Sequence, residues 1–400
     1  MQGMQGLIDW IVAKGLSADD IDDILVGLAE RLEEMGYPLL RASIAMPSID
    51  PMRKGFSVSW SPSSTMSIEV QGHDNAGQEL FRRSPISYLL SNDLEFGRWK
   101  LPSPADQETF PLLQELADLG ATDYLVRLIG FPGETALAGV GFSLAVDGPG
   151  GFSDEQIAGL DTFLPTLALA CYRIAAMRVA TDVLAVYTGV RTSGRILNGQ
   201  TRRGDGTSIY AAIMMADLKD FTSLNERYAP DDIVAWLNEH FEAIAQPVED
   251  AGGEILKFMG DSVLAIFPAE IDNPDDACRR ALSATMTALR TTAQLNSARA
   301  IAAKPEMLVD IVLHVGEVFY GNIGASRRLD FTAIGKAVNE AARIEKLCDA
   351  LDRNLLASEA FVAHVLDAFE MLGTFSLKGV SKPAKVYGLI SADLPDVSLL

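Results

Sequence analysis

Two aspartates lie where predicted strands end, which is where a sheet exposes side chains to a substrate. Asp217 follows the apolar run "IYAAIMMA", and Asp261 lies in the turn of a predicted hairpin, "EILKFMGDSVLAIF", residues 254–267. Carboxylate oxygens at neighbouring strand ends form a hard-ligand site suited to Mg²⁺ or Mn²⁺. Asp is also common in turns that bind nothing. The pair alone is therefore a weak indication of a metal site.

Three further polar side chains could act on a charged substrate. The segment "VNEAAR" places Asn339 and Arg343 at i and i+4, on one face of a predicted helix. Lys378 follows in "SLKG". Seen alone, such an arginine is more often a solvated helix charge or a partner of Glu340 or Glu345, and such a lysine lies on the surface. Their interpretation depends on the surrounding elements.

The elements from Ser208 onwards alternate between strands and helices, which indicates an α/β fold with a central sheet covered by helices. The run after Ser208 is continuously apolar, as expected for a strand buried on both faces. A helix with an apolar stripe follows and ends at Gly252-Gly253. The remaining predictions are the hairpin 254–267, helices over 274–291 and 335–351, and strands over 307–324, 373–379 and 384–390.

Three segments of this region resemble, in order and separation, the signature segments of the class III nucleotidyl cyclase catalytic domain. They are "MADLKDFTSLNERY", "GGEILKFMGDSVLAIF" and "FTAIGKAVNEAARIEKL", and the resemblance covers about residues 208 to 390. It implies an α+β domain with a central, mainly antiparallel, ferredoxin-like sheet covered by helices. It also implies that the hairpin carries both a base-reading residue and a metal ligand.

The resemblance implies that Asp217 and Asp261 bind two divalent cations, Mg²⁺ or Mn²⁺, with help from the backbone carbonyl of Leu218. Such ions can acidify a ribose 3′-hydroxyl and hold the triphosphate during cyclisation. Lys257 stands where adenine-specific members carry lysine and guanine-specific members carry glutamate. Thr332 occupies the second base-reading position, and its hydroxyl can accept a hydrogen bond from the adenine amino group. ATP is therefore the favoured substrate over GTP.

The other matched positions concern the ribose and the phosphates. Asn339 would orient the ribose, and Arg343 would neutralise charge growing on the phosphate, because its guanidinium is permanently charged. Lys378 matches a lysine that contacts the terminal phosphates, and Phe221 and Thr222 match substrate-binding positions. In the family, the site lies between two catalytic domains, with the metal aspartates on one and the Asn–Arg helix on the other. The resemblance therefore implies a homodimer.

The sequence departs from the family pattern at Asp220, a position usually occupied by glycine. An extra carboxylate there could repel the triphosphate or join the metal site. The histidines are dispersed without ligand spacing, so we assign them no chemistry: His73, His240, His314 and His364.

The first half of the chain has the pattern of a separate regulatory domain. A helix is predicted over residues 17–36, with Ser17 as its N-cap, and a long helix begins after Ser153. This order of helix, strands and closing helix resembles a GAF-type sensory domain over roughly residues 17 to 180; another α+β regulatory module is the alternative. The predicted strands cover 39–46, 55–60, 65–70, 122–131 and 136–146.

The long helix carries apolar residues at alternating spacings of three and four, the pattern of a heptad seam. This pattern predicts a coiled coil between two domains, and the alternative is a helix that packs on its own domain. A connector rich in Gly and Arg is predicted over 189–208. The seam residues are Leu169, Tyr172, Ala176, Val179, Val183, Val186 and Val190. The predicted domains are 1–160 (GAF-like sensor), 161–205 (signalling helix and linker) and 206–392 (cyclase catalytic domain).

The composition excludes several classes of partner. A net charge of −21 repels nucleic acid and anionic lipid. The three cysteines have no CxxC spacing, which argues against a disulfide framework or zinc site and favours a reducing cytoplasm. The first residues lack the features of a secretory signal. The longest apolar stretch is interrupted by Arg173, Arg178 and Asp182, so no membrane span is predicted.

The sequence therefore predicts a cytoplasmic, homodimeric adenylate cyclase that converts ATP to 3′,5′-cyclic AMP and pyrophosphate. Its N-terminal domain would receive an unknown small-molecule or protein signal. A guanylate cyclase is the nearest alternative, and Lys257 argues against it. A diguanylate cyclase is suggested only by "AGGEIL", without the acidic end of that motif. A catalytically silent, nucleotide-binding module is the third alternative, and the complete set of metal, ribose and phosphate residues argues against it.

Overall fold

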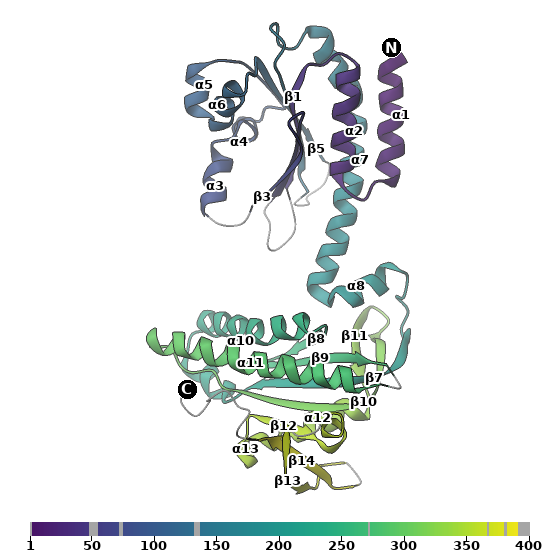
Figure 1. Ribbon diagram of the computed structural model, residues 1–400, viewed down its shortest axis with the longest axis vertical. Coiled ribbons are helices and arrows are strands. Elements are labelled where there is room, and N and C mark those ends of the chain that lie inside the picture. The colour runs from purple at the N-terminus through teal and green to yellow at the C-terminus, as the bar shows by residue number, and fades with distance from the viewer. Residues whose placement is uncertain are drawn as a thin grey trace. The chain divides into compact units, whose positions relative to one another are not determined.

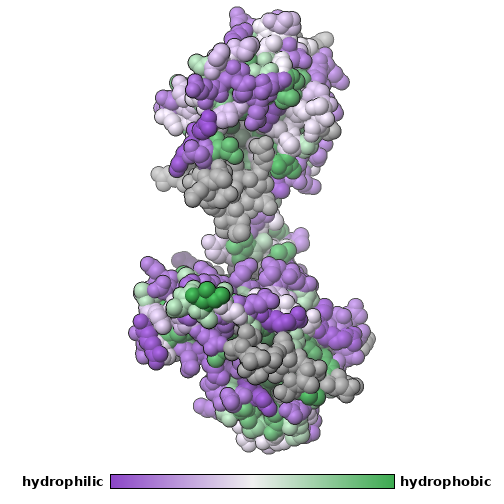
Figure 2. Space-filling view, turned by 60° about the vertical axis from the view of Figure 1, so that its left-hand side comes forward, coloured by the Kyte–Doolittle hydropathy of each residue, from purple (hydrophilic) through white to green (hydrophobic). Residues whose placement is uncertain are grey.

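The computed structural model describes residues 2–47, 55–71, 75–131, 137–270, 273–365, 368–379 and 382–390. The chain divides into two compact units, Met1–Leu184 and Ala185–Leu400. Each unit has its own sheet (Figure 1). The surface visible in Figure 2 is largely hydrophilic, with hydrophobic areas on both units. The predicted end of the catalytic domain, at 392, lies outside the described residues.

The N-terminal unit is built on a six-stranded sheet of order β3-β2-β1-β6-β5-β4. Every pair of neighbouring strands in it is antiparallel. The five predicted strands are confirmed, and β4 is an addition to the prediction. The bounds are β1 (Leu39–Pro47), β2 (Gly55–Ser61), β3 (Ser64–Gln71), β4 (Phe96–Lys100), β5 (Asp123–Gly130) and β6 (Gly139–Val146).

Helices cover both faces of this sheet (Figure 1). One face forms the main core of the unit with α1 (Gln2–Ser17), α2 (Ile21–Glu34) and α7 (Asp154–Thr188). A second apolar cluster, around Trp99 and Tyr124, joins the opposite face to shorter helices. The helices on that side are α3 (Asn75–Arg82), α4 (Pro85–Ser91), α5 (Pro104–Thr109) and α6 (Pro111–Asp118). The resemblance to a GAF-type domain stays a prediction.

The prediction of one helix over 17–36 is wrong at its start. Two helices form instead: α1 ends at Ser17, and α2 begins after Asp20, which has an extended backbone. The hydroxyl of Ser17 donates to the carbonyl oxygen of Ala13 at 3.0 Å, so it belongs to the last turn of α1. The first helix forms because its apolar side, which includes the fully buried Ile11, packs into the main core.

Helix α7 begins with the predicted cap. Gln156 donates its backbone N–H to the hydroxyl of Ser153 at 3.2 Å, and its side chain accepts from the backbone N–H of Ser153 at 2.9 Å. This reciprocal pair satisfies two free donors of the first turn. By length and composition alone, α7 could also cross a membrane, although 44% of its most apolar stretch is buried in the protein.

The predicted heptad seam is wrong at its last position. Helix α7 ends at Thr188, and Gly189, with φ of 85°, starts a new helix, α8 (Val190–Leu197). The backbone changes direction there because a left-handed residue cannot continue an α-helix. The predicted connector over 189–208 contains α8 and is therefore partly helical. Two of the seam residues within α7, Leu169 and Val186, have side chains that are 68% and 58% exposed.

The C-terminal unit is built on an eight-stranded sheet, and the predicted mainly antiparallel arrangement is confirmed. The strand order is β13-β14-β12-β10-β7-β9-β8, with β11 paired to β10, and only the β10–β12 pair is parallel among the described strands. The bounds are β7 (Gly206–Leu218), β8 (Glu254–Met259), β9 (Ser262–Ala269), β10 (Val309–Ala325), β11 (Arg328–Ile334), β12 (Leu355–Ser358), β13 (Phe369–Phe375) and β14 (Ala384–Leu389).

Strand β7 lies at the centre and is buried on both faces, which explains its continuous apolar sequence. Met214 and its alternating neighbours pack toward α10 (Pro230–Asp250) and α11 (Asp275–Ile301). Ile213 and its alternating neighbours pack toward α12 (Lys336–Glu345) on the opposite face. The sheet therefore separates two helical layers (Figure 1).

Two predicted helices of this unit differ from those observed. Helix α11 runs on to Ile301, past the predicted end at 291, because Asn296 and Arg299 are buried against the following loop. The helix predicted over 335–351 is divided: Leu347 donates its backbone N–H to Ile344, three residues back, which ends the regular α-helical pattern. The remaining short helices are α9 (Phe221–Arg227), α13 (Cys348–Leu351) and α14 (Glu359–Val362).

Candidate active site

The two predicted metal-binding aspartates lie where expected, at the end of β7 and in the β8–β9 turn. The hydroxyl of Ser262 donates to the carboxylate of Asp217. Burial raises the pKa of Asp261 above its usual value, and the negative charge of Asp217 raises it further. The two carboxylates therefore lie close enough to repel each other.

This donor set fits a hard divalent cation, because two carboxylates that repel each other gain from a shared positive charge. The carbonyl of Leu218 belongs to the same strand end as Asp217. In the described part of the chain, no group of three or more His, Cys, Asp or Glu side chains forms a complete metal cluster. Bound phosphate oxygens would have to supply further ligands, as is common for Mg²⁺.

His240, to which the sequence assigned no chemistry, lies on α10 beside this acidic pair. Its side chain is 1% exposed. Burial lowers the pKa of His240 to about 4, against the opposing effect of the nearby Asp261 backbone and the Asp217 carboxylate. The imidazole is therefore neutral at pH 7. Sequence spacing did not indicate this position, because α10 precedes the hairpin and meets it only in the folded unit.

The predicted base-reading residues come together on two strands. The ammonium group of Lys257 on β8 lies 2.6 Å from a carboxylate oxygen of Asp330 on β11. Thr332 follows two residues later on β11 and is 5% exposed. Its buried hydroxyl has no hydrogen-bond partner among the described residues. A buried hydroxyl without a partner is costly, so a ligand that bonds to it would gain affinity.

The Asn–Arg pair lies on α12, on the opposite side of the sheet from α10. Asn339 is exposed and Arg343 is half-buried. A Cβ atom placed on Gly379 would lie 3.2 Å from the guanidinium of Arg343, so the backbone of the turn approaches it closely. Lys378, exposed in the same turn, is thereby brought near Arg343. The φ of 76° at Gly379 favours glycine at this position.

The backbone conformation of the segment after β7 explains why position 220 accommodates glycine or aspartate. Its φ of 56° places it in the left-handed region, where glycine is accommodated without strain and aspartate better than most residues. The side chain of Asp220 is exposed. Phe221 packs in a small apolar cluster with Leu218, whereas Thr222 is exposed in the first turn of α9.

An acidic group around Lys219 was not predicted from the sequence. The ammonium group of Lys219 lies 3.2 Å from Asp349 and 3.7 Å from Asp310. Burial raises the pKa of Glu345, and the negative charge of Asp217 raises it further. Burial likewise raises the pKa of Asp310. These acids come from separate elements; the one available signal was the carboxylate within the apolar strand "LVDIVLHV".

The site residues thus form separate groups within one chain. Asp217 and Asp261 form the first, Lys257 and the Thr332 strand the second, and Arg343 with the Lys378 turn the third. Among the interactions of the described residues, no hydrogen bond or ion pair joins the third group to the first.

The mainly antiparallel sheet, the carboxylates at its strand ends and the Asn–Arg helix define a nucleotide cyclase type of catalytic unit. Residues 208–391 match the family model of the adenylate and guanylate cyclase catalytic domain. This part of the chain belongs to that family, the class III cyclases, and the predicted resemblance is confirmed.

Curated relatives match over the same region. Adenylate cyclase 1 of Rhizobium meliloti (strain 1021) is 34% identical over 182 residues, which are 44% of this chain and 27% of the relative. An adenylate cyclase of Anabaena cylindrica is 32% identical over 180 residues, 44% of this chain and 34% of the relative. The chain therefore spans about a third or less of their lengths. A crystal structure of the guanylyl cyclase Cya2 aligns with a TM-score of 0.41 and 27% identity, over 46% of this chain and 93% of that one.

Proposed function

We propose that the chain is an adenylate cyclase that converts ATP to 3′,5′-cyclic AMP and pyrophosphate. The observation that carries the proposal is the hairpin that holds Lys257 and Asp261 within four residues of each other. It carries on one hairpin both a cation for the base and a carboxylate for the metal ions, the two chemical requirements of a nucleotide cyclase. The relatives named adenylate cyclase support the same reaction.

The reaction needs charge neutralisation more than covalent chemistry from the protein. The ribose 3′-oxygen attacks the α-phosphorus, the bond to pyrophosphate breaks, and the hydroxyl proton leaves to solvent. Divalent ions, when bound at Asp217 and Asp261, supply a more acidic hydroxyl and neutralise the triphosphate. Arg343 would neutralise charge growing on the phosphate, Asn339 would hold the ribose, and the exposed Lys378 would contact the terminal phosphates.

The preference for adenine follows from hydrogen-bond chemistry. Adenine N1 is an acceptor, so the ammonium group of Lys257 can donate to it, whereas guanine presents a donor at that position. The hydroxyl of Thr332 has no protein partner among the described residues and can accept from the adenine amino group. Bound guanine would leave two donors facing each other at Lys257. We therefore favour ATP over GTP.

Two chains are required in this proposal. Among the described residues, no hydrogen bond or ion pair joins the Asp217–Asp261 pair to the Arg343 group, so a second copy would bring its Arg343 group to the carboxylates of the first. We accordingly propose a homodimer, with the N-terminal unit as the regulatory input. The chain's net charge of −21 and its buried free cysteines suit a soluble protein in a reducing cytoplasm.

The test is a product assay with purified chain, ATP or GTP, and Mg²⁺ or Mn²⁺, resolved by chromatography. We expect cyclic AMP from ATP, little cyclic GMP from GTP, and no product after chelation of the metal or with Asp217→Ala. Preferential formation of cyclic GMP would show that the unit is a guanylate cyclase. Nucleotide binding without any cyclic product under all four conditions would identify a silent nucleotide-binding module.

A further inference from the structure

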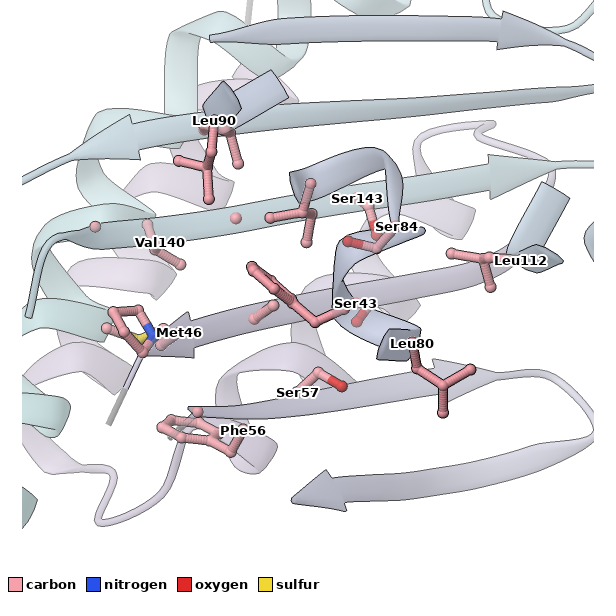
Figure 3. Close-up of a pocket in the computed structure, with 18 of the residues that line it drawn as sticks. Ser43, Met46, Phe56, Ser57, Leu80, Ser84, Leu90, Leu112, Val140 and Ser143 are labelled. Atoms are coloured by element: carbon pink, nitrogen blue, oxygen red, sulfur yellow. The ribbon is translucent and has the colours of Figure 1, made fainter. Parts of the chain in front are cut away.

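The N-terminal unit contains a cavity of about 670 Å³ on the face of its sheet that carries the shorter helices. Figure 3 shows its floor on the strands, with Ser43, Ser57 and Ser143, and its walls on the helices, with Leu80 and Leu112 among them. Cavities of this size hold small organic ligands. No part of the proposed catalytic reaction uses it.

The walls of the cavity are mainly apolar, and several of them are exposed. Leu80, Leu90 and Leu119 line the cavity and are 69%, 60% and 68% exposed. Phe56 of β2 also lines it. Leucine side chains that face solvent around a concave surface would gain free energy if a ligand covered them. Hydrophobic areas also interrupt the hydrophilic surface of this unit in Figure 2.

The floor of the cavity is polar, and its hydrogen bonds run in one direction, from Arg41 to the backbone of β2. Arg41 donates to the hydroxyl of Ser59 at 2.6 Å, Ser59 donates to Ser43 at 3.1 Å, and Ser43 donates to the carbonyl oxygen of Val58 at 2.9 Å. The serine hydroxyls thus direct their donors into the sheet. Arg41 is half-buried and lines the cavity, and among the described residues its guanidinium donates only to Ser59, which leaves most of its donors for a ligand.

Among the described residues, no ion pair balances the charge of Arg41. Arg83 and Glu115 also line the cavity, but both are exposed at its rim and carry opposite charges. In the described lining, the interior therefore combines an apolar body with one cation. A planar guanidinium in such a place pairs best with a carboxylate, through two parallel hydrogen bonds.

We propose that this cavity binds a small, largely apolar molecule with a single carboxylate, and that Arg41 pairs with that carboxylate. Nucleotides fit less well, because several phosphate charges would meet only one interior cation. Binding does not depend on the proposed cyclase function; only the expectation that the ligand regulates cyclisation rests on it.

Decanoate is a suitable probe, because it joins an alkyl chain to one carboxylate, and 1-decanol is its uncharged counterpart. Calorimetry on the full chain at probe concentrations below micelle formation should show decanoate binding at least 10-fold more tightly than decanol. Decanoate should also raise the unfolding temperature, since a ligand of the folded state stabilises it. Equal affinity for the two probes would overturn the carboxylate assignment.

Variants of Arg41 test whether this residue binds the carboxylate. Arg41→Gln should weaken decanoate binding by about 10-fold or more, because a charge-assisted bond is lost, and should leave decanol binding unchanged; Arg41→Lys should retain part of the preference. Arg82→Gln is the matched control, because this arginine pairs with Glu79 on α3 and does not line the cavity. Wild-type decanoate binding by Arg41→Gln would overturn the proposal.

A cavity-filling variant separates this site from others on the chain. Leu90→Trp places a larger side chain at an exposed position of the lining, where folding tolerates it, and should weaken both probes. Unchanged binding would place decanoate elsewhere and overturn the proposal. If decanoate binds as expected but no cyclic nucleotide forms in any condition, the proposed cyclase function fails while the binding site stands.

Discussion

Lys257 is held in the free chain by a weak interaction. Its partner Asp330 has a side chain that is 64% exposed, and Lys257 itself is 26% exposed. Ion pairs so near solvent contribute about 0–1 kcal/mol. The ammonium group can therefore leave Asp330, or be shared with it, when a purine base arrives. The Asp330 carboxylate holds the ammonium group of Lys257 beside β11, the strand that also bears Thr332.

Replacing Lys257 should change nucleotide use without unfolding the protein. We expect Lys257→Glu to lower kcat/KM for ATP by roughly 100-fold, because the carboxylate would face an acceptor on adenine. The matched control is Lys385→Glu, which breaks an ion pair of the same length, 2.6 Å, with Glu359 on the surface. Steady-state kinetics of both variants measure the loss of kcat/KM, and thermal unfolding checks that both remain folded. ATP kinetics that are the same in both variants would remove Lys257 from the base site.

His240 should make the metal-free protein less stable as the pH falls. Its pKa is about 4 in the folded chain and 6.5 in the unfolded chain, so between these values the unfolded state binds more protons. The neutral imidazole therefore contributes stability above pH 6.5 that is lost as the pH falls toward 4. Asp261 acts in the opposite direction, because its raised pKa makes the folded state bind protons more readily.

The corresponding test is urea unfolding in a chelator at about pH 7 and about pH 5.5. From His240 alone we expect a loss of about 1 kcal/mol in the free energy of unfolding over this range. His240→Gln should show a smaller loss than the wild type by about that amount. Equal losses in the two proteins would mean that His240 is not a buried neutral imidazole.

At the scale of secondary structure, α8 is fixed to the strand that carries Lys257. The hydroxyl of Thr192 donates to Glu254, the first residue of β8, at 3.0 Å, and the hydroxyl of Tyr320 donates to the other carboxylate oxygen at 2.7 Å. The guanidinium of Arg195 lies 4.7 Å from the Tyr320 ring centroid. Glu254 is 5% exposed, so these donors satisfy a buried carboxylate. Any movement of α8 would act directly on β8.

Thr192 offers a sharp test of this connection. We expect Thr192→Val, which keeps the shape of the side chain, to lower the free energy of unfolding by about 1–3 kcal/mol, since it leaves one oxygen of a buried carboxylate unsatisfied. Thr192→Ser keeps the donor and should lose much less. Because β8 carries Lys257, the proposed base-reading lysine, the valine variant should also raise KM for ATP. If the two variants unfold alike, the hydrogen bond is not holding α8 in place.

The elements that the sequence predicted well are those whose pattern reflects burial on a defined face. Strand β7 was predictable because both of its faces are covered, and α10 because its apolar stripe faces one layer. Helix α8 was not, because its glycine and two arginines are typical of a linker. Its buried partner, Glu254, is 62 residues away from Thr192 in the sequence. Strand β11 was missed for a similar reason: it begins with charged residues, and only its pairing with β10 makes it a strand.

The sequence indicated the residues of the candidate site but not how the folded chain groups them. Motif order singled out Asp217, Asp261 and Arg343. Motif order could not indicate that the acidic side chains around Lys219 lie near Asp217 and add to its negative charge. These carboxylates are far from Asp217 in the sequence, and only the folding of the sheet and α12 brings them together. Among the described residues, no interaction joins the acidic pair to Arg343, so in the proposed homodimer metal ions and residues of the second chain would balance its negative charge.

That arrangement predicts complementation between two inactive variants. Asp217→Ala should abolish metal binding, and Arg343→Ala should remove a key stabilising charge, so each variant alone should lose about 10²–10³-fold in activity. In a mixed dimer, one of the two sites carries both lesions and the other carries neither, because a symmetric dimer builds each site from opposite chains. The intact site should then give up to about half of the wild-type activity per mixed dimer, if the sites act independently.

The measurement uses differently tagged variants, co-expressed and purified through both tags, and scored for cyclic AMP formation against each variant alone. The control is a mixed dimer of Asp217→Ala with Asp261→Ala. In the shared-site arrangement the two aspartates of one chain serve the same site, so each site of this control dimer lacks one of them, and the dimer should stay inactive. Recovery in the first pair but not in the control would locate the carboxylates and Arg343 on opposite chains. Verified mixed dimers of the first pair that remain as inactive as their parents would instead require a site within one chain, or strict coupling of both sites.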